Sequence, residues 1–124
     1  MGNLLLVMTG GAAGAGARHL VGRWTLQALG PGYPWGTLTV NLAGGLLMGL
    51  LVGTLARAGG GEGVRLLLGV GVLGGFTTFS AFSLDVVQMI ERGALATALG
   101  YVAASVIGAI AALAAGLALT RGLA

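Results

Sequence analysis

A set of polar but mostly uncharged residues lies inside stretches of the chain that are otherwise apolar. They are hydroxyls, one amide and one carboxylate: Thr37, Thr39, Asn41, Thr77, Thr78, Ser80, Ser83, Asp85, Tyr101 and Ser105. Polar groups are costly in a membrane interior, so they normally face a partner helix or a water-filled path. Hydroxyls and amides donate hydrogen bonds without carrying charge. Such a lining suits a small anion better than a metal cation, because a cation requires several carboxylates.

A purely structural interpretation competes with this one, because Ser and Thr hydroxyls in membrane helices often bond to the carbonyl one turn earlier. Asn41 fits that interpretation poorly, since its own helix cannot meet all four hydrogen-bonding sites of the amide. Tyr101 and Ser105 are spaced i and i+4, which places them on one helix face and could extend a polar track.

The most unusual stretch is GGFTTFSAFSLD, residues 74–85. Gly74 and Gly75 weaken a helix, and the hydroxyls of the two following threonines compete for backbone groups. A break there would free carbonyl oxygens at mid-membrane depth, where a second copy of the chain or a bound cation must satisfy them. Phe79 and Phe82 would then share a face of the resumed helix. Their positive ring edges can solvate an anion, although phenylalanines at this spacing also serve as ordinary core.

Charged groups are few enough to be considered singly. Arg18 comes about fifteen residues into the first apolar segment, roughly 22 Å along a helix. Its guanidinium either extends to the membrane interface or raises the anion concentration in a vestibule. His19 is the only histidine and cannot build a metal site alone. The chain has no cysteine, which excludes thiolate chemistry, and its arginines form no basic cluster of the kind that binds nucleic acid.

Composition identifies the class of protein. Of 124 residues, 56% are hydrophobic and only 7% charged, which is typical of an integral membrane protein. Glycine, proline and charge punctuation divides the chain into four segments, each long enough to span a bilayer as a helix. We therefore predict an all-α membrane protein forming a single domain over residues 1–124, with helices at about 3–29, 36–58, 64–90 and 94–121.

Small residues recur every four positions in the second and fourth segments: Gly45, Gly49 and Gly53, then Gly100, Ala104, Gly108, Ala112 and Gly116. Such stripes let helix backbones approach closely in lipid. Packing within one chain would explain them, but two stripes in so small a protein favour a homo-oligomer.

The arginines are distributed evenly between the two sides of the membrane. If the four segments alternate in direction, Arg57, Arg65 and Arg121 lie on one side, and Arg18, Arg23 and Arg92 lie on the other. The positive-inside rule then gives no strong preference. We predict insertion in both orientations and pairing as an antiparallel dimer.

Three segments together resemble the Fluc family of fluoride channels, also called CrcB. GGFTTFSAFSLD resembles its third-helix signature, GGAAGAGARHL its first-helix element and GTLTVNLAGGLLMG its second-helix element. The resemblance implies a dual-topology homodimer in the cell membrane, with a broken third helix and two antiparallel pores that pass fluoride outward and reduce its toxicity.

The resemblance also implies roles for individual residues. Phe79 and Phe82 would line the pore with Asn41 beside them, and the polar rails would comprise Thr37, Ser80, Ser83, Tyr101 and Ser105. Backbone carbonyls of Gly74 and Thr77 would hold a structural sodium ion at the dimer axis, and Arg18 would be the vestibule arginine. Two positions depart from the family pattern: Ala81 replaces a threonine, and Asp85 replaces a glutamate with a longer reach.

Other functions fit the residues less well. A coupled small-multidrug transporter would share the four helices, but its titratable group would have to be Asp85 or Glu91, near the end of the third segment. A holin-like assembly protein would leave the polar third segment unexplained. No nucleophile–base pair or metal-ligand constellation suggests an enzyme.

Overall fold

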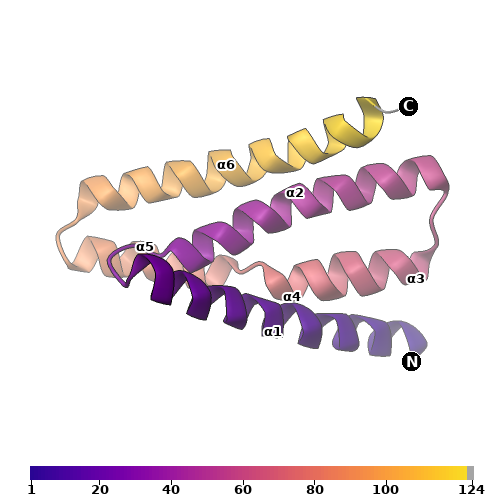
Figure 1. The fold of residues 1–124 in the computed structure, drawn as a ribbon, viewed down its shortest axis with the longest axis horizontal. Helices are drawn as coiled ribbons and strands as arrows, with labels where there is room; N and C mark the ends of the chain where they lie inside the picture. The colour runs from indigo at the N-terminus through magenta and orange to yellow at the C-terminus, as the bar shows by residue number, and fades with distance from the viewer. Residues whose placement is uncertain (123–124) are drawn as a thin grey trace.

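Four helical spans run side by side in the computed structural model of the protein, which describes residues 1–122 (Figure 1). Three spans are single helices: α1 (Gly2–Leu29), α2 (Trp35–Ala58) and α6 (Leu95–Gly122). The third span consists of α3 (Glu62–Val64), η1 (Arg65–Leu73), α4 (Gly74–Phe76) and α5 (Phe79–Glu91). These bounds are close to the ranges expected from the sequence.

Glycine and proline end the helices where the sequence places them. Gly30, with φ of 80°, follows α1, and two prolines occupy the short loop before α2. Gly59 adopts the left-handed conformation after α2 and donates its N–H to the carbonyl of Leu55. The N-terminus, the α2–α3 connection and the end of α6 consequently lie at one end of the bundle, and the α1–α2 and α5–α6 connections lie at the other (Figure 1).

The four spans match the prediction of a membrane protein. Each is long and apolar enough to cross a bilayer. Only 11% of the most apolar stretch is buried within the chain for α1 and α6, and only 22% for α2 and the third span. Most apolar side chains therefore face outward, toward lipid or a partner.

The third span changes its backbone conformation along its length. η1 is a π-helix of nine residues, a form that is rare at this length. Thr77 (φ −87°, ψ 159°) and Thr78 (φ −153°, ψ 117°) are extended, so helical backbone ends at Phe76 and resumes at Phe79. As a result η1 and α4 pack on α1, whereas α5 packs on α6.

Glycines form the contact between α1 and the first half of the third span. A Cβ added to Gly14 would overlap the carbonyl of Val72, and one added to Gly75 would lie 2.6 Å from the carbonyl of Gly11. A Cβ added to either Gly10 or Gly71 would lie 2.9 Å from the Cα of the other. The backbones touch, so no larger residue fits without moving a helix.

A second glycine contact joins α2 to α6 within the same chain. A Cβ on Gly45 would lie 2.8 Å from the carbonyl of Ala109, and one on Gly116 would lie 2.5 Å from the carbonyl of Leu46. Gly49 packs against Leu113 in the same way. Intrachain packing thus accounts for most of the two small-residue stripes, while Gly100 meets no side chain and is exposed. The stripes themselves therefore do not favour an oligomer.

Candidate functional site

A cavity of about 460 Å³ lies beside the interruption of the third span, between α2, α5 and α6. Its polar lining comes from four residues: Asn41, Thr77, Thr78 and Ser105. Phe79 and Phe82 line it as well, together with aliphatic residues of α6. The cavity therefore brings together Asn41 of the second span, the interruption with the two phenylalanines after it, and Ser105 of the fourth span.

Asn41 holds the extended backbone in place. Its Oδ1 accepts a hydrogen bond from the Thr78 N–H at 2.8 Å, and its Nδ2 donates to the Thr78 carbonyl at 3.0 Å. The Asn41 side chain thus pairs with both the N–H and the C=O of Thr78, which in a helix would pair with backbone groups one turn away. The hydroxyl of Thr78 then caps the resumed helix by accepting from the Ala81 N–H at 3.1 Å.

Two hydrogen-bond donors in this cavity have no partner among residues 1–122. An asparagine amide carries two N–H donors, and Asn41 commits only one of them, to Thr78. The Ser105 Oγ is buried and makes no hydrogen bond. A buried hydroxyl without a partner costs about 1–3 kcal/mol, so a bound water or anion in the cavity would be favourable.

The two phenyl rings lie together but differ in exposure. Their centroids are 5.5 Å apart, with the planes tilted by 47°. Phe82 is 8% exposed and packs on the Tyr101 ring, whereas Phe79 is 76% exposed on the surface of the chain. The expectation that they point the same way is only partly met, because one ring is in the core and the other is uncovered.

Other predicted pore residues use their hydroxyls locally. Ser83 donates to the carbonyl of Phe79 at 2.9 Å, and Thr77 donates to that of Leu73 at 3.0 Å, both one turn earlier. Ser80 is exposed, and its Oγ lies 3.3 Å from that of Thr78. The structural interpretation therefore accounts for Ser83 and Thr77 as they stand here.

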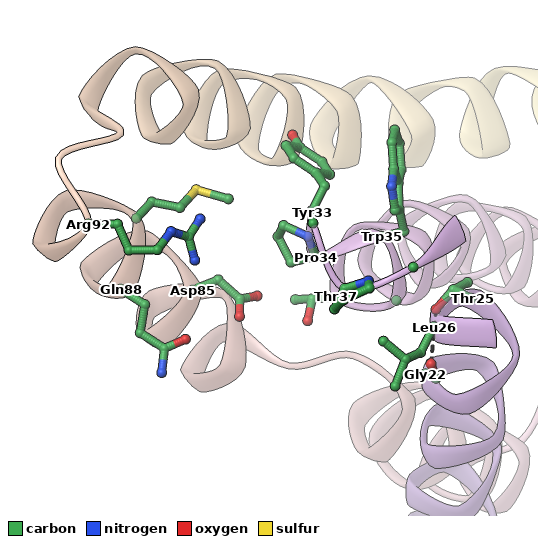
Figure 2. A pocket seen from close by; sticks show the side chains of 15 residues that line it. Gly22, Thr25, Leu26, Tyr33, Pro34, Trp35, Thr37, Asp85, Gln88 and Arg92 are labelled. Carbon is green, nitrogen blue, oxygen red and sulfur yellow. Dashed lines mark hydrogen bonds between the residues drawn. The ribbon is translucent and has the colours of Figure 1, made fainter. Parts of the chain in front are cut away.

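Tyr101 is fully buried and donates its hydroxyl proton to Asp85 Oδ2 at 2.8 Å. A phenol has one O–H, so Tyr101 keeps only acceptor capacity for anything else. Asp85 also lines a second cavity, of about 330 Å³, whose wall includes Thr37 and Tyr33 (Figure 2). The Asp85 side chain points toward Thr37 there (Figure 2).

Aromatic rings connect the two cavities. The Tyr33 ring packs edge-on against Tyr101, with centroids 5.5 Å apart, and Tyr101 in turn packs on Phe82 at 5.2 Å. Tyr33 belongs to the α1–α2 loop, where burial raises the pKa of its phenol, so the group stays protonated at neutral pH. Tyr101 thus lies between the cavity that contains Asp85 and the one that contains Ser105.

Arg18 lies against the interruption from the α1 side. Its Nε donates to the Gly75 carbonyl at 3.1 Å. The same side chain lines a third cavity, of about 320 Å³, together with His19, Arg23 and Thr78. The vestibule role of Arg18 stays a prediction, and its bond to the backbone was not expected.

The carbonyls of Gly74 and Thr77 have lost their helical donors. In a continuous helix they would accept from the N–H groups of residues 78 and 81. Those N–H groups instead donate to Asn41 Oδ1 and Thr78 Oγ1. Residues 1–122 contain no group of three or more acidic or histidine side chains that could hold a metal. Any cation here would therefore depend on such carbonyls.

Comparison with known proteins identifies the family. Residues 5–117 match the family described as CrcB-like protein, Camphor Resistance (CrcB). A protein of Sphingopyxis alaskensis named fluoride-specific ion channel FluC is 58% identical over 122 residues, which cover 98% of this chain and 97% of the relative. The chain belongs to the CrcB family. Proteins of the same name from Mesorhizobium japonicum and Phenylobacterium zucineum are 56% and 61% identical, covering 99% and 95% of this chain and 99% and 94% of the relatives.

Membership of the CrcB family and the four apolar spans establish a multi-pass membrane protein. The shorter carboxylate of this CrcB chain, Asp85, still reaches the Tyr101 hydroxyl, so the missing methylene does not prevent that contact. Ala81 has no hydroxyl, and its backbone N–H donates to the hydroxyl of Thr78, which caps α5.

Two contacts were not predicted from the sequence: the close packing of α1 on the third span, and the packing of the Tyr33 ring. Gly10 and Gly14, like Gly71 and Gly75, repeat the four-residue spacing that was noticed only in the second and fourth segments. The Tyr33 ring packs on Tyr101, a contact that the sequence did not predict. No local sequence pattern indicates that contact, because the residues are 68 positions apart by subtraction of their numbers.

Proposed function

We propose that this protein is a fluoride-selective channel that passively releases fluoride from the cell and thereby limits its toxicity. The observation that carries the proposal is the cavity lined by Asn41, Phe79, Phe82 and Ser105, where one amide N–H and one buried hydroxyl have no partner among residues 1–122. These groups are uncharged hydrogen-bond donors next to aromatic ring edges. Both kinds of group interact favourably with an anion. The relatives' names support fluoride as that anion.

The proposed path begins in the cavity beside Asp85 and Thr37, passes Tyr101 and continues between Phe82 and Ser105 toward Asn41 and Phe79. Unpaired donors would replace part of the water around fluoride in the narrow part of the path. Arg18 would raise the local anion concentration on the α1 side of the interruption. Ser80 and Ser83 would contribute hydroxyl oxygens along the resumed helix.

An antiparallel homodimer completes the proposal. Phe79, Ser80 and Gly74 are exposed on the chain at the level of the interruption. Freed backbone carbonyls are costly in lipid, and a second copy packed on this surface would shield them from it. Each copy would then present its phenyl rings to a pore, giving two pores of opposite direction.

A structural sodium ion fits the same interface. The Gly74 and Thr77 carbonyls lack their helical donors, and unwound backbone carbonyls are the ligands that hold Na⁺ in other membrane proteins. Two copies would supply four such oxygens at the axis. The bound ion would supply positive charge to offset the carbonyl dipoles and would link the two copies.

Efflux from liposomes tests the function. Purified protein is reconstituted into liposomes loaded with fluoride and chloride, and release of both is followed with ion-selective electrodes in the presence of a potassium ionophore. We expect rapid fluoride loss, retained chloride and no change when a protonophore collapses any proton gradient. Equal loss of chloride, or a fluoride rate no greater than in protein-free liposomes, would refute the proposal. Dependence on the proton gradient would instead indicate a coupled transporter.

A further inference from the structure

One arginine lies in a cavity without a partner. Arg92 follows α5, and with Asp85, Gln88 and Met89 it lines the cavity of about 330 Å³ at the end of the bundle (Figure 2). The spacing of these four positions places them on one helix face. Glu91 does not line the cavity. Within residues 1–122, the Arg92 guanidinium makes no hydrogen bond or ion pair.

Two residues of opposite charge line this cavity. Asp85 supplies the only carboxylate of its lining and Arg92 the only cation. Asp85 is half-buried and bonded to Tyr101, whereas Arg92 is exposed, and its guanidinium points into the cavity toward the loop that carries Tyr33 (Figure 2). An anion that approached Asp85 alone would be repelled, and the permanent charge of a guanidinium opposes that repulsion.

We propose that Arg92 captures small hydrated anions from solution at this mouth and offsets the charge of Asp85 on the path inward. The cavity is wide enough for several water molecules, so the anion would arrive with much of its hydration shell. The anion would lose that shell further along the path, in the cavity between Asn41 and Ser105. This inference rests on the proposed function and adds to it a residue that raises the rate of anion entry.

Arg92 would act on the anion through long-range electrostatic attraction, because it does not line the cavity between Asn41 and Ser105. A field of this kind raises the rate at which anions arrive, and dissolved salt screens it. A structural role for Arg92 at the end of α5 would also be disturbed by substitution. Loss of such a role would persist at high salt, and this difference separates the two explanations.

The experiment measures initial fluoride efflux from liposomes at low (about 20 mM) and high (about 500 mM) ionic strength, where the screening length falls from over 20 Å to under 5 Å. Four forms are compared: wild type, Arg92→Gln, Arg92→Glu and Arg92→Lys. The matched control is Arg65→Gln, since Arg65 pairs with Glu62 at the opposite end of the span and lines none of the three cavities described above.

At low ionic strength we expect Arg92→Gln to reduce the rate on the order of threefold, and Arg92→Glu to reduce it further. Arg92→Lys and Arg65→Gln should stay near wild type, and all differences should largely vanish at high ionic strength. Equal rates for wild type and Arg92→Gln at low salt would overturn the inference while leaving the channel intact. A loss that is the same at both salt concentrations would also overturn it. Absence of fluoride efflux from wild type would instead refute the proposed function, and the inference with it.

Discussion

The hydrogen bond from Tyr101 to Asp85 links a buried residue of α6 to a residue of α5 that lines the cavity at the end of the bundle. The phenol is completely buried, and the carboxylate reaches it at 2.8 Å although it is shorter than the glutamate of the family pattern. The sequence indicated both residues as polar groups in lipid. It could not indicate that they bond to each other, because the bond depends on how α5 packs on α6.

Tyr101→Phe should keep the ring packing against Tyr33 and Phe82 but leave Asp85 without this donor. We expect a loss of about 1 kcal/mol in the free energy of unfolding, since the carboxylate is only half-buried and water partly replaces the phenol. Thermal unfolding in detergent measures the change. Tyr33→Phe is the control, because no hydrogen bond of the Tyr33 hydroxyl occurs within residues 1–122. Equal melting temperatures for the two variants would contradict the assigned role.

The hydroxyl residues show the limit of reasoning from residue type alone. Ser83 and Ser105 look alike in sequence, yet Ser83 bonds to its own helix and Ser105 has no partner among residues 1–122. Both serines lie in helices with a carbonyl one turn earlier, so local geometry does not distinguish them. Only tertiary packing around Ser105 decides where its hydroxyl points.

The interruption of the third span depends on a residue in another helix. Weak helix formers at residues 74–78 indicated where the backbone leaves the helix, but the partner that stabilises the extended form comes from α2. Nothing in the sequence predicted that η1 would be a π-helix. The eight residues after Arg65 in η1 are all apolar or small, and a hydropathy pattern does not distinguish i→i+4 from i→i+5 hydrogen bonding in such a run.

Asn41→Ala should destabilise the protein by at least about 2 kcal/mol, because both the N–H and the carbonyl of Thr78 lose their partner. The free energy of unfolding in detergent, measured by loss of helical circular dichroism, provides the check. Ser80→Ala serves as the control, since that side chain is exposed. If Asn41→Ala unfolds no more easily than the control, the amide does not hold the interruption.

Gly14→Ala should destabilise the contact between α1 and the third span by about 1–3 kcal/mol, because the new methyl group meets the backbone of Val72 and Phe76. Gly16→Ala in the same helix is the matched control. Nothing lies within 4 Å of its added Cβ, so it should be neutral or stabilising by up to about 1 kcal/mol. Thermal melts of both variants test the claim, and equal stability changes in the two would contradict a close backbone contact specific to Gly14.

At the level of the whole chain, the arrangement of charges agrees with what alternating spans require. Both the N-terminus and the end of α6 lie at one end of the bundle (Figure 1). Arg57, Arg65 and Arg121 therefore lie toward that end and Arg23 and Arg92 toward the other, while Arg18 lies beside the interruption. The number of spans was predictable from composition, whereas the surface that a second copy covers was not, because the glycine stripes proposed for it pack within one chain.

The proposed dual topology predicts that reporters fused to the C-terminus show both orientations in cells. Arg23→Gln combined with Arg92→Gln leaves three arginines against one, and this variant should favour a single orientation. Compartment-specific labelling of the fused reporter measures the ratio. A single orientation of the wild-type protein would exclude an antiparallel dimer.

Selective conduction of fluoride is the central claim, and its most direct test is the reversal potential of the current through protein in a planar bilayer. A tenfold fluoride gradient is balanced by an impermeant anion, with chloride equal on both sides. The account predicts reversal at the equilibrium potential of fluoride, about 59 mV from zero at 25 °C. Reversal near zero, where chloride is at equilibrium, would contradict it.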